Sequence, residues 1–128
     1  DIVGATNATY TPAGVAVGSL VRVTATYSDA FGQKSVASPE HFSVGSSGAN
    51  TLAVMVPAQV ILGLSGNDTI VGFSSGQRVD GGAGTDTIRI SGTSVDLNAA
   101  SDAQIINVEA ISASGAEGSV VLDLSRQS

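Results

Sequence analysis

The chain has 128 residues, which is enough for one domain or two small ones. Its formal net charge of −6 argues against nucleic acid and anionic membrane surfaces as partners, and leaves cations as candidates. Cysteine and tryptophan are absent and aromatic residues make up 4%, so disulfides and thiolate metal sites are excluded and the core must be aliphatic. No apolar run is long enough to predict membrane insertion.

Residues 1–45 are predicted to form antiparallel β structure. Over 19–29, the apolar residues Val21, Val23, Ala25 and Tyr27 alternate with polar ones, which predicts a strand with one buried face. A turn over 28–35 and a returning strand over 35–44 follow, with Pro39 marking an edge or a break. A shorter strand and loop are expected over 8–19.

The rest of the chain divides by composition. The small, polar, glycine-rich residues around 46–51 predict a linker. Residues 52–98 follow a nine-residue rhythm. Residues 99–128 contain two further strand-like runs, 103–115 and 119–128, and are expected to form a β-rich tail or cap.

The nine-residue rhythm is clearest in the blocks 63–71, 72–80 and 81–89, each of which begins with glycine. Position eight of five successive blocks is always aliphatic: Ile61, Ile70, Val79, Ile88 and Leu97. This predicts one inward-facing side chain per nonamer, and two nonamers per coil of a flattened helix. Residues eighteen apart would then stack on neighbouring coils, about 4.8 Å apart.

That stacking would place Asp68 and Asp86 one above the other on one edge. Two carboxylates ~5 Å apart repel each other by about 3 kcal/mol at an effective dielectric constant near 20, and a divalent cation between them reverses the sign. Carboxylate and carbonyl oxygens without His or Cys favour Ca²⁺ over Zn²⁺ or Cu²⁺, with Mg²⁺ second. The alternative is that both residues are ordinary turn aspartates.

The segment 81–89, GGAGTDTIR, resembles the RTX or hemolysin-type calcium-binding nonapeptide GGxGxDxUx at all its fixed positions, and 63–71 matches it except at Leu64. The resemblance implies a parallel β-roll that binds Ca²⁺ between adjacent coils. It implies that Asp68 and Asp86 bind the ion through their side chains. It implies backbone carbonyl ligands at Gly63, Ser65, Gly82 and Gly84. The opposite edge has Gln77 and Val95 at the aspartate position, so one calcium site is expected.

The N-terminal residues 4–38 resemble the second half of a bacterial immunoglobulin-like repeat. The expected fold is therefore all-β: an N-terminal Ig-like segment (1–45), a linker (46–51), a short parallel β-roll or solenoid (52–98) and a β-rich continuation or cap (99–128). The expected function is that of a calcium-binding structural module beside neighbouring domains of a large secreted bacterial repeat protein, and the RTX resemblance suggests export by a type I system. The alternatives are an adhesive module that grips sugar or a host protein, and an accessory region of a secreted peroxidase or protease.

No catalytic role is expected for the chain itself. His41 is the single histidine and has no acidic or nucleophilic partner in the sequence pattern. Asp80 is predicted to be a turn residue, and Glu109 and Asp123 solvated strand residues.

Overall fold

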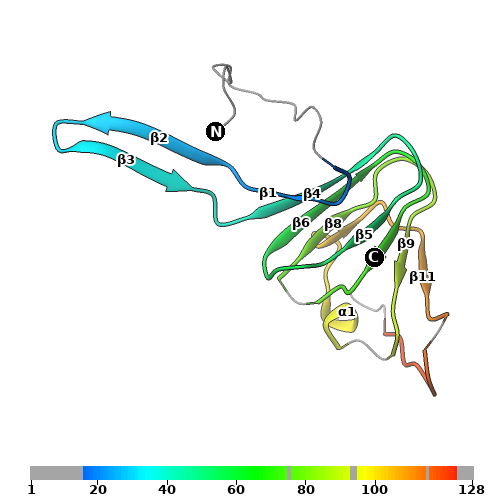
Figure 1. Cartoon of the computed structure of the whole chain (residues 1–128). Helices are drawn as coiled ribbons and strands as arrows, with labels where there is room; N and C mark the ends of the chain where they lie inside the picture. Colours follow the sequence, from blue (N-terminus) through cyan, green and yellow to red (C-terminus); the bar gives the residue numbers. More distant parts are fainter. Residues whose placement is uncertain (1–15, 75, 93–94, 115, 124–128) are drawn as a thin grey trace.

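The computed structural model describes residues 16–74, 76–92, 95–114 and 116–123 (Figure 1). These residues are almost entirely strands and loops, so the expected all-β class is confirmed. No helix among them is long and apolar enough to cross a membrane. The elements are β1 (Leu20–Val21), β2 (Thr24–Asp29), β3 (Gly32–Ala37), β4 (His41–Ser46), β5 (Thr51–Ala53), β6 (Gln59–Leu64), β7 (Thr69–Val71), β8 (Arg78–Asp80), β9 (Thr87–Arg89), α1 (Val95–Ala99), β10 (Ile105–Ile106) and β11 (Ala110–Ser112).

From β4 onward the chain alternates between two sheets. The first has the strand order β1-β4-β6-β8-β10 and the second the order β11-β9-β7-β5. Within these two sheets every pairing is parallel except that of β1, which runs antiparallel to β4. Ser43 pairs with Ile61, and Ile70 with Ile88, so residues eighteen apart lie side by side, as the nine-residue rhythm predicts.

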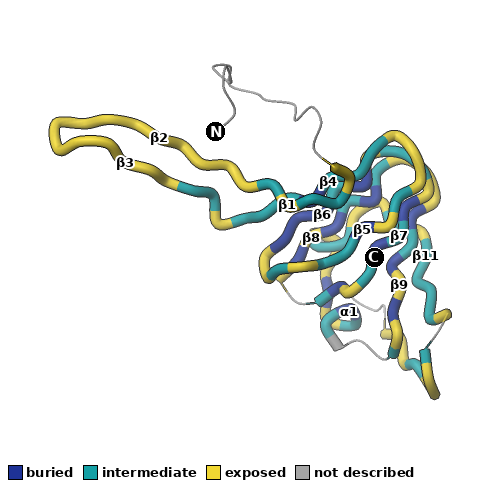
Figure 2. The backbone as a smooth tube through the Cα atoms, in the orientation of Figure 1, coloured by how far each residue is buried: buried dark blue, intermediate teal, exposed yellow. Residues whose placement is uncertain are grey.

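The core lies between these sheets and is built from the predicted position-eight residues (Figure 2). All five of them are buried, with exposed fractions of 1% or less: Ile61, Ile70, Val79, Ile88 and Leu97. Leu52, which pairs with Ile70, is equally buried. The inward position of the eighth residue is therefore confirmed, and these columns of aliphatic side chains supply much of the burial that holds the short strands together. The core is not limited to them, since it also contains Phe73, Ile90 and Ala100.

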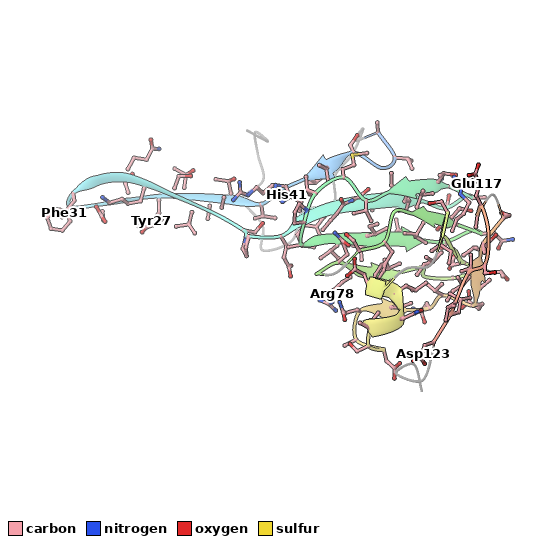
Figure 3. All side chains as sticks on the ribbon, turned by 90° about the horizontal axis from the view of Figure 1, so that it is seen from below. Tyr27, Phe31, His41, Arg78, Glu117 and Asp123 are labelled. Carbon is pink, nitrogen blue, oxygen red and sulfur yellow. The ribbon has the colours of Figure 1, made fainter. Side chains whose placement is uncertain are left out.

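The predicted buried face of the N-terminal strand is wrong. Strands β2 and β3 form a two-stranded hairpin that projects from the two sheets, and every residue of β2 is exposed (Figures 1 and 2). Tyr27 lies along the hairpin and Phe31 at its tip, where Phe31 is 89% exposed (Figure 3). The alternation is present in the sequence, but nothing in the described residues covers the apolar side. The break at Pro39 is confirmed, since β3 ends at Ala37 and β4 begins at His41.

The expected linker is a turn of the main structure. Ser46 is the last residue of β4 and Thr51 the first of β5, and both strands pair with strands eighteen residues further along. The Asn50 side-chain oxygen accepts a 2.6 Å hydrogen bond from the Ser46 N–H, which closes the turn. The division at residue 45 therefore cuts through one continuous pair of sheets.

The C-terminal part also departs from the prediction. Residues 95–99 form the helical turn α1 in place of a nonamer strand. Leu97 is nevertheless buried in the core. The run 103–115 supplies β10 and β11 as expected. Residues 119–123 carry no strand. Residues 124–128, and the predicted strand over 8–19 up to residue 15, lie outside the described residues.

Candidate metal centre

One edge of the two sheets is built by four turns, of which the first three begin with glycine. The turns 45–50, 63–68 and 81–86 connect β4 to β5, β6 to β7 and β8 to β9, each one eighteen residues after the last. A shorter turn over 107–109 connects β10 to β11. We call the edge formed by these four turns the acidic edge.

Hydrogen bonds join successive turns of the acidic edge through their acidic side chains. The Asn50 N–H donates to Asp68 Oδ1, and the Asp68 N–H donates to Asp86 Oδ1, each over 2.7 Å. The Asp86 N–H donates to Glu109 Oε2, also over 2.7 Å. Asp68 and Asp86 are thus on neighbouring turns in direct contact, as the eighteen-residue spacing predicts.

The second oxygen of each aspartate is buried without a hydrogen-bond partner. Asp68 and Asp86 are 1% and 0% exposed, and the Oδ2 atom of each has no donor nearby. A buried carboxylate oxygen without a donor is costly, because the group has lost its water. Each oxygen is therefore a candidate ligand for a cation.

The surroundings of Asp68 Oδ2 contain another acceptor. A Cβ atom added at Gly63 would lie closer than 3.0 Å to both Asp68 Oδ2 and the Gly81 carbonyl oxygen. These two oxygens, one from each turn, therefore lie close together beside Gly63, which has no side chain to separate them. We call this pair of neighbouring acceptors a cradle, because it could bind a hard cation or share a proton.

The electrostatics agree with this geometry. Burial raises the pKa of Asp68, the Asn50 N–H bound to its Oδ1 opposes the rise, and the negative charge of Asp86 adds to it. The ionised form of Asp68 is thus disfavoured in the ion-free protein. A cation in the cradle would remove that penalty, and it would compete with a proton for the same oxygen.

The carbonyl ligands implied by the nonapeptide resemblance belong to residues of the same two turns, 63–68 and 81–86. The Gly63 carbonyl oxygen and Asn50 Oδ1 flank the position of a Gly45 Cβ, and Ser65 forms a bridge with Ala83. Gly82 and Gly84 have φ angles of 96° and 143°, and the close neighbours of their absent Cβ atoms are the carbonyl oxygens of Leu64 and Gly66. The carbonyl beside Asp68 belongs to Gly81, which was not among the predicted ligands.

The opposite edge uses glutamine where the acidic edge uses aspartate. Gln59 Oε1 accepts from the Met55 N–H, and Gln77 Oε1 accepts from the Ser74 N–H, each over 2.8 Å. Gln77 Nε2 donates to the Val56 carbonyl on the preceding turn. Each amide thus serves as acceptor and donor at once, which a carboxylate cannot do.

Leu64 stands where the nonapeptide has its second glycine, and it takes the glycine conformation. Its φ is 76°, beside 96° for the equivalent Gly82, and its side chain is half exposed. A left-handed conformation costs a leucine roughly 1–2 kcal/mol. A glycine avoids this cost, but part of the gain in stability is offset because glycine makes the unfolded chain more flexible.

We therefore expect Leu64→Gly to raise the free energy of unfolding by about 0.5–1 kcal/mol, measured by urea denaturation. Leu64→Ala is the matched control, since alanine shortens the side chain and keeps the strained φ. Equal effects of the two substitutions would show that the backbone conformation is not the cause.

The described residues contain no group of three or more His, Cys, Asp or Glu side chains placed to hold a metal. An ion on the acidic edge would therefore need carbonyl and water oxygens to complete its coordination. His41 lies at the start of β4, on the side of the glutamine edge. Asp80 Oδ1 accepts a hydrogen bond from Asn107 Nδ2 over 2.8 Å.

A scan against protein-family models and searches of curated proteins and solved structures find no match for this chain.

Proposed function

We propose that this chain is a non-catalytic calcium-binding module of a larger secreted repeat protein. In this proposal the alternating parallel strands are a short β-roll, and Ca²⁺ binds on the acidic edge between Asp68 and Asp86. The observation that carries it is the pair of buried aspartate oxygens without donors, one of which shares its cradle with the Gly81 carbonyl.

The donor set supports Ca²⁺ over other metals. Only oxygen atoms are available, from Asp68, Asp86, backbone carbonyls and water, and Ca²⁺ takes six to eight oxygens in flexible geometry. Mg²⁺ requires a tighter octahedron and retains more of its own water, so it ranks second. Bound Ca²⁺ would neutralise the repulsion between the two stacked carboxylates and join one turn to the next.

The structural role follows from the size of this effect. Extracellular calcium sites bind at ~10⁻⁴ to 10⁻³ M, and at about 1 mM Ca²⁺ a site at the tight end adds about 1.4 kcal/mol to stability. That is a fraction of what a domain requires, so the aliphatic columns must supply the remainder. Calcium would then tighten the acidic edge outside the cell, where the ion is abundant.

The test is calorimetric Ca²⁺ titration of the wild type beside Asp86→Asn. We expect the substitution to abolish binding, since Asp86 contributes to every acidic pair on this edge. It should also raise the calcium-free stability by about 1 kcal/mol, because the new amide can donate to the backbone carbonyl beside it. This second readout distinguishes a lost ligand from a lost fold.

The control is Asp29→Asn, which removes one negative charge from the exposed hairpin, where Asp29 Oδ1 accepts from the Phe31 N–H. Calcium binding should be the same as in the wild type. A wild-type protein without calcium affinity, or one whose binding survives Asp86→Asn, would refute the proposed function.

A further inference from the structure

The last turn of the acidic edge repeats the earlier ones with a different sequence. Ile105 pairs with Val79 and Ile111 with Ile88, so the connection from β10 to β11 is three residues shorter than the one from β8 to β9. No glycine or aspartate lies in this turn. The nonapeptide pattern therefore gives no sign of a site here.

Asn107 directly follows β10, as Gly81 directly follows β8. Its φ is 51°, in the left-handed region that asparagine tolerates better than most residues. Its carbonyl oxygen lies closer than 3.0 Å to the position of a Gly81 Cβ, as the Gly81 carbonyl does to that of Gly63. The carbonyl column of the acidic edge thus continues to Asn107.

Glu109 takes the place of the turn aspartate. Its Oε2 accepts the Asp86 N–H over 2.7 Å, the same distance as the bond that the Asp68 N–H makes to Asp86 Oδ1. The extra methylene of glutamate makes up for the shorter turn. Glu109 is exposed, so the carboxylate reaches the edge from the solvent side.

The space between these two turns contains an unpartnered buried oxygen. Asp86 Oδ2 has no donor, Asp86 is fully buried, and both this oxygen and the Asn107 carbonyl oxygen lie within 3.0 Å of the Gly81 Cβ position. The same combination of buried carboxylate oxygen and carbonyl oxygen defines the cradle at Asp68. Here the second carboxylate is Glu109.

We propose that a second Ca²⁺ binds between Asp86 and the 107–109 turn, held by Asp86, the Asn107 carbonyl and the Glu109 carboxylate. This inference rests on the proposed function and adds a site that lies outside the nonapeptide repeats. We expect about tenfold weaker binding than at Asp68, because ordering the exposed Glu109 side chain costs rotamer entropy.

The other end of the acidic edge lacks such a site. Asn50 is neutral, and its Oδ1 already accepts hydrogen bonds from the N–H and hydroxyl of Ser46. The two ions are therefore expected between the 63–68 and 81–86 turns and between the 81–86 and 107–109 turns. Two calcium ions per chain is the expected stoichiometry.

The test uses Ca²⁺ titration by calorimetry on the whole chain, with Asp68→Asn and Glu109→Gln. Glu109→Gln keeps an oxygen for the Asp86 N–H and removes the charge, so it should leave one ion, the tighter one. Asp68→Asn should leave one ion, the weaker one. Glu40→Gln, the same change just before β4 at the opposite edge, should leave both.

The outcomes separate the two proposals. A single ion that is lost in Asp68→Asn and unaffected by Glu109→Gln would overturn this inference and leave the proposed function standing. A single ion lost in Glu109→Gln and kept in Asp68→Asn would establish the second site and refute the first. One ion lost in both variants would overturn the two-site reading, and no binding at all would overturn both proposals.

Discussion

Gly63→Ala is expected to lower the free energy of unfolding by about 3 kcal/mol, the upper part of the usual range for an overpacked site. The added Cβ would lie closer than 3.0 Å to the Gly81 carbonyl oxygen and to Asp68 Oδ2. The carbonyl belongs to the neighbouring turn, so relief of the clash requires the two turns to separate. Urea denaturation measures the loss.

The matched control is Gly48→Ala, in the preceding turn of the same edge. A Cβ at Gly48 would meet open space, so stability should stay the same or rise by up to about 1 kcal/mol. Gly63→Ala should also weaken Ca²⁺ binding, since its methyl group fills the cradle. A Gly63→Ala variant as stable as Gly48→Ala would show that neighbouring turns are not in contact at this carbonyl.

Ile88→Ala is expected to cost about 3 kcal/mol, within the range for large-to-small substitutions in a core. Ile88 is fully buried and lies between Ile70 and Ile111 on the adjoining strands. Alanine would leave a cavity in the middle of the aliphatic column, and the strands are too short to close it without losing their register. Chemical denaturation gives the difference in unfolding free energy.

Ile106→Ala provides the comparison for that measurement. Ile106 is in β10, at the end of the first sheet, and is 36% exposed. Its truncation should cost less than about 1 kcal/mol, because its side chain is already partly in water. Comparable losses at Ile88 and Ile106 would contradict a core organised around the position-eight residues.

The regular part of the fold was predictable because its period is fixed by the sequence. Once Asp68 and Asp86 set the phase, the same count predicted which residues stack and which aliphatic side chains face inward. A column of identical contacts leaves little freedom, since a shift by one residue would turn Ile70 and Ile88 outward. The same regularity placed the two aspartates in contact.

One further turn could have been found from the same phase. Gly45, Gly48, Asn50 and Leu52 occupy positions one, four, six and eight of a nonamer that begins eighteen residues before Gly63. Its small polar residues favoured a linker, because composition alone does not distinguish a tight turn from a flexible connection. The aliphatic residue at position eight was the signal that a core position lay there.

Other features carried no such signal. Glu109 joins the acidic edge only because the last turn is shorter and glutamate is longer than aspartate, and both facts depend on the register of β10 and β11. The prediction of a buried face on the hairpin was wrong for a different reason. Its alternation shows which side chains share a face, yet whether Tyr27 is covered depends on what packs against that face.

The bonds along the acidic edge have a direction. Each turn supplies a backbone donor to the turn that follows it in the chain, so Asn50 depends on Asp68, Asp68 on Asp86 and Asp86 on Glu109. Removing turns from the amino end and removing them from the carboxyl end therefore have different consequences. Removal of the first turn takes one backbone donor from a carboxylate, which water can then reach. Removal of the last turn leaves a main-chain amide without an acceptor, next to newly exposed aliphatic side chains. A chain emerging amino end first would leave each of these amides unsatisfied until the following turn had arrived.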